Sequence, residues 1–106
     1  MRYLMLARSE DNTPDERLYT EMAKFIEEMT ASGVLLATGG LEAGGVTVTS
    51  VGGEITVTDG PFAESKEAVG GFALVEVRSK EEAIELARRF RGIVGDGQSV
   101  IQQVFS

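Results

Sequence analysis

Acidic, basic and aromatic residues converge in one short stretch, Thr56 to Glu67, which reads TVTDGPFAESKE. Asp59 offers a carboxylate that can act as a general acid or base, and Lys66 is close enough in sequence to bias its ionisation. Gly60 and Pro61 stiffen the turn, because proline fixes its own φ and restricts the residue before it. This combination predicts a candidate catalytic group, Asp59, on a rigid turn beside a cleft.

The same stretch has a purely structural interpretation. Aspartate commonly forms turns through its own backbone, so Asp59 can simply close a hairpin, with Phe62 anchored in the core. From residue types alone we favour this turn. In the functional interpretation, Gly60, Phe62 and Lys66 are the candidate substrate-binding residues beside Asp59.

The sequence contains neither histidine nor cysteine. Zinc sites of the usual kind, thiolate chemistry and histidine-based nucleophilic triads are therefore excluded. No stretch has the spacing of a calcium-binding loop. We expect no metal site and no cofactor.

The formal charge of the 106-residue chain is −7, from 17 acidic and 10 basic residues. A nucleic-acid-binding protein needs a basic surface, so this function is not expected. The local cluster of Arg88, Arg89 and Arg91 is typical of favourable charge near a helix C-terminus. No apolar run is long enough to span a membrane or to serve as a signal peptide, so we expect one cytoplasmic domain, residues 1–106.

Two amphipathic helices are expected. Thr13, Pro14 and Glu16 predict the start of the first, as cap, first helical residue and capping-box partner. Ser79 and Glu82 form a second capping box. The apolar stripes at helical spacing are Leu18, Met22, Phe25, Ile26 and Met29 in the first helix, and Ala83, Ile84, Ala87 and Phe90 in the second.

Strands are expected at residues 2–7, 34–38, 71–77 and 99–105, and a hairpin at 46–58 that turns at Gly52-Gly53. The hairpin turn pairs Thr47 with Thr58, so one face carries Val46, Val48, Ile55 and Val57, and the threonines lie on the other. The glycine-rich residues 39–45 resemble a phosphate-binding loop but lack its GK[ST] ending, which favours a simple connector. The element order predicts an α+β, ferredoxin-like split βαβ fold with an inserted β-hairpin.

Three of the expected strands are apolar on both faces, at residues 3–6, 72–77 and 100–105. In this fold both helices pack on one face of the sheet, so the other face needs a cover. The simplest cover is the same sheet of a second copy, which predicts a homodimer. The alternative is a monomer with an unusually apolar surface.

The chain resembles the YCII-related family, in the branch marked by a DGPF motif. The resemblance is carried by Thr56 to Glu67, by VGGFALVEVRSKEEAIELARRF (Val69 to Phe90), by GDGQSVIQQVF (Gly95 to Phe105) and by the opening strand. It implies a dimeric α+β barrel, in which two ferredoxin-like sheets pack face to face.

The resemblance also carries functional expectations. The family is similar in fold to small cofactor-free oxygenases and lactone isomerases, and some relatives carry a proposed His-Asp dyad. The dyad cannot be transferred to a chain without histidine, whereas Asp59 and Lys66 stand in the motif itself. Members of the branch are often encoded beside extracytoplasmic-function sigma factors, which implies a possible regulatory partner.

Three functions remain open from the sequence. The chain can be a cofactor-free or degenerate enzyme that uses Asp59, a ligand-binding or regulatory dimer without chemistry, or a partner-binding protein in which the motif is structural. We favour a pocket for a small organic molecule near the DGPF turn.

Overall fold

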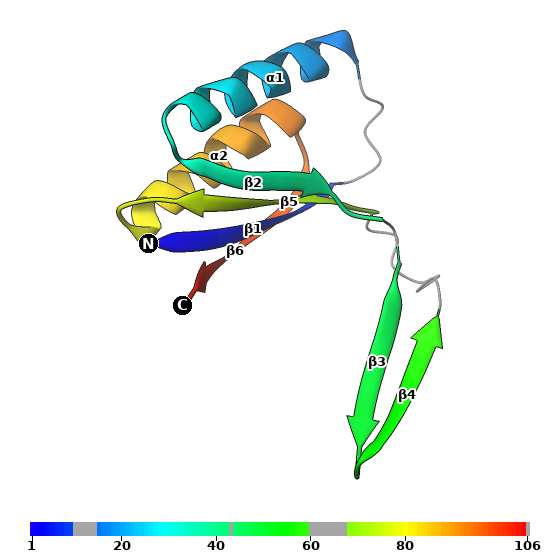
Figure 1. Ribbon diagram of the computed structural model, residues 1–106. Helices are drawn as coiled ribbons and strands as arrows, with labels where there is room; N and C mark the ends of the chain where they lie inside the picture. Colours follow the sequence, from blue (N-terminus) through cyan, green and yellow to red (C-terminus); the bar gives the residue numbers. More distant parts are fainter. Residues whose placement is uncertain (10–14, 43, 60–67, 106) are drawn as a thin grey trace.

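The computed structural model describes residues 1–9, 15–42, 44–59 and 68–105. Within these residues, two helices and six strands form an α+β fold (Figure 1). In chain order the elements are β1 (Arg2–Ser9), α1 (Glu16–Ala31), β2 (Leu35–Gly40), β3 (Val46–Val51), β4 (Glu54–Asp59), β5 (Ala68–Glu76), α2 (Lys80–Val94) and β6 (Gly97–Val104).

Four of the strands form one antiparallel sheet in the order β2-β5-β1-β6. Both helices lie on the same face of this sheet (Figure 1). This is the ferredoxin-like split βαβ arrangement that the element order predicts, and β3 and β4 form the inserted hairpin as a second, two-stranded sheet. No helix of the described residues is long and apolar enough to cross a membrane.

The core lies between the helices and the sheet. Side chains alternate along a strand, so Tyr3 and Met5 of β1 and Val75 of β5 share the face that the helices cover. Met29 of α1 and Leu86 of α2 pack against them. The buried hydrophobic residues are Tyr3, Met5, Met29, Val75, Val77, Ala83 and Leu86.

The first helix begins later than its sequence predicts. Its cap is Asp15, whose carboxylate accepts a hydrogen bond of 2.8 Å from the backbone N–H of Leu18, and Glu16 is the first helical residue. The predicted capping by Thr13 is therefore wrong, because the side chain of the aspartate two residues later pairs with a free N–H group of the first turn. Thr13 and Pro14 lie outside the described residues.

The second helix begins at the predicted cap. The Ser79 hydroxyl accepts a hydrogen bond of 3.2 Å from Glu82 N–H, and the Glu82 carboxylate accepts one from Arg78 N–H. The helix then continues past Gly92 to Val94. Ile93 and Val94 are half-buried, so packing of these side chains favours the extra helical residues.

Two arginines of α2 make ion pairs along the helix rather than only at its end. Arg88 pairs with Glu85 at 2.6 Å, and Arg89 pairs with Glu28 of α1 at 2.7 Å. The basic cluster thus joins the two helices by an exposed bridge, a contribution of about 1 kcal/mol or less.

The hairpin has the predicted register. Thr47 pairs with Thr58, Val48 with Val57 and Thr49 with Thr56. Gly52 and Gly53 both have positive φ, at 57° and 83°, as a two-residue turn of this kind requires.

Part of the predicted glycine-rich connector belongs to the sheet. Gly39 and Gly40 end β2 and pair with Phe72 and Gly71 of β5. The two strands approach so closely that a Cβ on Gly71 would lie 2.6 Å from the carbonyl oxygen of Gly39. Glycine here serves a close backbone contact within the sheet.

The face of the sheet opposite the helices is apolar at its centre. In the observed register, Leu4 and Leu6 of β1 lie on this face beside Leu74 and Phe72 of β5 and opposite Gln102 and Val100 of β6. No described helix covers it (Figure 1). We call it the helix-free face; its apolar residues are Leu4, Leu6, Phe72, Leu74, Val100 and Val104.

Candidate functional site

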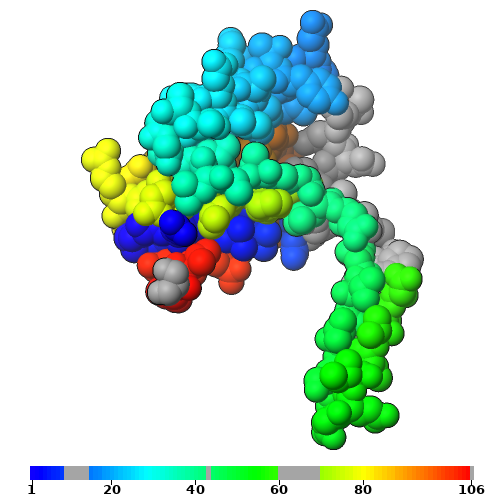
Figure 2. All heavy atoms as spheres, viewed as in Figure 1, coloured from blue at the N-terminus to red at the C-terminus, as the bar shows by residue number. Residues whose placement is uncertain are grey.

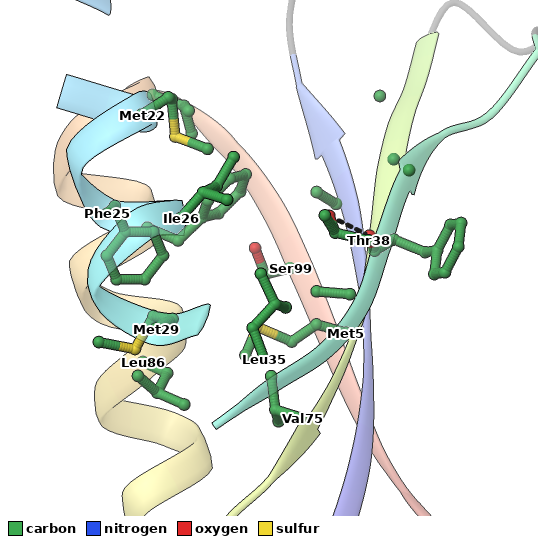
Figure 3. Close-up of a pocket in the computed structure, with 18 of the residues that line it drawn as sticks. Met5, Met22, Phe25, Ile26, Met29, Leu35, Thr38, Val75, Leu86 and Ser99 are labelled. Atoms are coloured by element: carbon green, nitrogen blue, oxygen red, sulfur yellow. Dashed lines mark hydrogen bonds between the residues drawn. The ribbon is translucent and has the colours of Figure 1, made fainter. Parts of the chain in front are cut away.

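A cavity of about 320 Å³ lies between the helices and the sheet. One wall is the apolar stripe of α1, where Met22 and Ile26 point toward the sheet and Phe25 lies beside the helices (Figure 3). Leu86, Phe90 and Val94 of α2 complete the helical side. The stripe that the sequence predicts as core therefore forms the core at Met29 and a cavity wall toward Met22.

Small residues on the sheet explain why the space stays open. Ala7 of β1, Gly40 of β2, and Gly71 and Ala73 of β5 line the cavity opposite the large helical side chains. Gly71 cannot carry a side chain because of its contact with the Gly39 carbonyl. The sheet at this end is therefore too flat to fill the gap below α1.

Two hydroxyl groups bring polarity to the cavity. The Thr38 hydroxyl donates a hydrogen bond of 2.9 Å to the carbonyl oxygen of Phe72 (Figure 3). The Ser99 hydroxyl is buried and has no hydrogen-bond partner among the described residues. A buried hydroxyl without a partner destabilises the fold, so a ligand that forms a hydrogen bond with the Ser99 hydroxyl would offset this cost.

None of the described residues that line the cavity is ionisable. Arg91 follows the lining residue Phe90, with its guanidinium 5.0 Å from the ring centre and Nη1 donating to the Arg8 carbonyl oxygen. Burial lowers the pKa of Arg91 from its ordinary value. The arginine stays charged near neutral pH, because its ordinary pKa lies far above that range.

A second, more polar groove lies between the start of α1 and the end of α2. Asp15, Glu21 and Asp96 contribute carboxylates to it, and Arg17 a positive charge. No group of three or more acidic, histidine or cysteine side chains within the described ranges is arranged to hold a metal ion.

The residues that the sequence singles out stand apart from the cavity lining. Asp59 is the last residue of β4, is exposed, and pairs with Val46 of β3. It is not among the described residues that line the cavity. Gly60, Phe62 and Lys66 lie outside the described residues. The segment that carries them leads into β5, whose Gly70 and Gly71 line the cavity.

Sequence reasoning missed Thr38 and Ser99 as candidate site residues. One signal was available for Ser99, because alternation along the last strand places it on the same face as Ile101, which packs against the core. A serine in an inward position is a departure from the apolar pattern of that face.

Residues 1–97 of the chain match the YCII-related domain family. The chain belongs to the YCII-related family. The match includes every described cavity-lining residue of this YCII-related protein except Ser99, and it includes the DGPF stretch.

Two similar proteins complete the comparison. An uncharacterized protein of Rhizobium meliloti (strain 1021) is 53% identical over 36 residues, which are 34% of this chain and 29% of that protein. The chain thus matches less than a third of that relative's length. The YCII-related chain is also similar in structure to 5-chloro-2-hydroxyhydroquinone dehydrochlorinase (TftG) from Burkholderia phenoliruptrix AC1100, solved in complex with 2,5-dihydroxybenzoquinone. The TM-score is 0.49 and the identity 16%, over 99% of this chain and 94% of that chain.

Proposed function

We propose that this YCII-related protein binds a small, mostly apolar organic molecule in the cavity between the helices and the sheet. The observation that carries the proposal is an apolar cavity of about 320 Å³ that contains a buried hydroxyl, Ser99, without a partner among the described residues. Ligand pockets typically begin near this size and combine apolar walls with a few polar groups that orient the ligand.

The cavity lining favours an uncharged ligand. An ionised group moved from water into an apolar cavity needs a partner of opposite charge, and the described lining offers none. A neutral ring or chain with one hydroxyl or carbonyl group fits better, because the polar group can pair with Ser99. The hydroxyl can donate to a carbonyl or accept from a hydroxyl.

Catalysis, if the protein performs it, requires a group from outside this lining. We place the chain in the DGPF-motif branch, on Asp59, Gly60 and Phe62. Asp59 is then the acid-base group and Lys66 its charge partner. Supporting this, the segment that holds them continues directly into β5, and Gly70 and Gly71 are part of the cavity lining.

The binding proposal is tested by filling the cavity. A thermal-shift screen of neutral aromatic and aliphatic compounds identifies a ligand for the native protein. The Ala73→Leu variant adds volume inside the cavity, and Ala23→Leu adds the same volume at an exposed position of α1 that does not line the cavity. We expect Ala73→Leu to abolish the thermal shift and Ala23→Leu to retain it. Equal binding by Ala73→Leu would overturn the proposal.

The catalytic part is tested separately. Asp59→Asn keeps the size and the turn-forming oxygen but removes the base. For an identified ligand, an acid-base role predicts weaker binding or lost turnover in a folded Asp59→Asn variant. Unchanged binding and turnover would leave Asp59 with only a structural role, while the cavity proposal would stand on the Ala73→Leu result.

A further inference from the structure

The β3–β4 hairpin projects from the body of the molecule, away from the helices and on the side of the helix-free face (Figures 1 and 2). It forms its own two-stranded sheet, with no ladder to the four-stranded sheet among the described residues. A two-stranded hairpin is at best marginally stable in water unless another element covers it. The isolated chain provides no such cover in the described structure.

One face of the hairpin is largely aliphatic. The observed register places Val46, Val48, Ile55 and Val57 together, with Ser50 opposite Ile55 and Asp59 opposite Val46, and we call the four aliphatic residues the aliphatic face. Their exposed fractions range from 59% to 66%. The opposite face carries Thr47, Thr49, Thr56 and Thr58, which water can solvate, and it ends in Val51 and Glu54 beside the turn. The β-branched residues of the aliphatic face therefore form a row that has no contact with the core.

The surface area of the chain indicates how large the missing cover is. The chain exposes 7755 Å², whereas a folded monomer of its 11.3 kDa mass exposes about 5,700 Å². Its radius of gyration is 16.0 Å, against about 13 Å for a compact domain of this length. An excess of about 2,000 Å² per chain is comparable to what each subunit of an obligate homodimer buries.

The chain itself offers the most fitting cover. The hairpin projects on the side of the helix-free face, so a second copy that covers this face can also reach the hairpin (Figure 1). A twofold dimer needs a surface that is complementary to itself, and an uncharged sheet centre flanked by a projecting aliphatic ribbon meets this need. We propose that the β3–β4 hairpin is an intersubunit arm that packs its aliphatic face against a second copy of this chain.

The test uses two matched pairs of substitutions on the hairpin. Val48→Lys with Val57→Lys changes one directly opposed pair of the aliphatic face, and Thr49→Lys with Thr56→Lys changes the adjacent opposed pair on the other face. Both double variants add the same charge to the same ribbon. By sedimentation velocity we expect the valine variant to dimerise at least about 100-fold more weakly and the threonine variant to stay within about threefold of the native protein.

A milder variant distinguishes loss of the interface from unfolding of the hairpin itself. Val48→Thr with Val57→Thr keeps β-branched residues in both strands and makes the aliphatic face resemble the opposite one. We expect this variant to dimerise at least about tenfold more weakly. In the native protein, we expect hydrogen exchange of the hairpin amides to slow only at concentrations where the protein is dimeric. A native protein that is monomeric at all concentrations, or a dimer of native affinity in both valine variants, would overturn the proposal.

Discussion

At the scale of single residues, the two hydroxyl groups of the cavity differ in a way that matters for function. Thr38 satisfies its hydrogen-bonding capacity by donating to the Phe72 carbonyl, whereas Ser99 is buried with no partner among the described residues. A ligand that pairs with the Ser99 hydroxyl would remove the cost of burying that group unpaired. Ser99 is therefore the residue at which stability and ligand binding should respond in opposite directions.

We predict that Ser99→Ala leaves the free energy of unfolding unchanged or raises it by up to about 1 kcal/mol, because it removes an unpaired buried polar group. The same substitution should weaken binding of a cavity ligand. Urea denaturation and ligand titration measure the two effects. Thr38→Val is the contrasting variant: it loses a formed hydrogen bond and should cost about 0.5–1.5 kcal/mol. A destabilised Ser99→Ala would mean that its hydroxyl is already paired.

The two glycines Gly71 and Gly92 provide a second comparison. A Cβ on Gly71 would lie 2.6 Å from the Gly39 backbone oxygen, so we expect Gly71→Ala to destabilise the fold by about 1–3 kcal/mol. Gly92 lies in α2, and a Cβ added there would meet nothing within 4 Å, so Gly92→Ala should stabilise by about 0.5–1 kcal/mol. Thermal unfolding of both variants decides this, and equal effects would contradict the close strand contact.

At the scale of secondary-structure elements, the start of α1 depends on one side chain. Asp15 caps the helix through its 2.8 Å hydrogen bond with Leu18 N–H. We predict that Asp15→Ala lowers the free energy of unfolding by about 1 kcal/mol and that Asp15→Asn has a much smaller effect, because asparagine also caps well. Urea denaturation tests this pair. If alanine and asparagine behave alike, the cap does not limit the stability of the helix.

Elements with strong local signals were predictable from the sequence. The Gly52-Gly53 turn determines the register of β3 and β4, so each predicted cross-strand pair is confirmed. Ser79 capping is confirmed for the same reason, since the interaction is local. The first helix shows the limit of local patterns: several capping residues stand near its start, and the sequence alone does not distinguish Asp15 from Thr13.

The cavity was not predictable in the same way. Met22 and Phe25 have the spacing of core residues, and only the sheet opposite them shows that part of the space stays empty. The glycines that end β2 have the composition of a loop. They belong to the sheet because β2 approaches β5 closely there, and this contact cannot be read from the glycine-rich segment alone. The candidate residues Asp59, Gly60, Phe62 and Lys66 remain predictions from the DGPF stretch.

At the scale of the whole molecule, the helix-free face and the exposed hairpin have a common consequence. Only seven hydrophobic residues among those described are buried in the isolated chain, and none of the larger described side chains is completely buried. A core of this size gives modest stability. Burial of apolar surface against a second copy would add to it, which links folding of the body to self-association.

The proposed dimer predicts that the midpoint temperature of unfolding rises with protein concentration, because such a dimer would dissociate as its subunits unfold. Each tenfold increase should add about 1.4 kcal/mol to the stability per dimer.

Val100, on the helix-free face, is 40% exposed in the single chain. Val100→Lys should therefore lower the stability of a monomer little but weaken an apolar interface strongly. The variant is therefore expected to be folded, to sediment as a monomer and to lose the concentration dependence. Ala23→Lys, which places the same charge on an exposed position of α1, should keep both the dimer and the dependence. A Val100→Lys protein that dimerises as tightly as the native one would exclude the helix-free face as the interface.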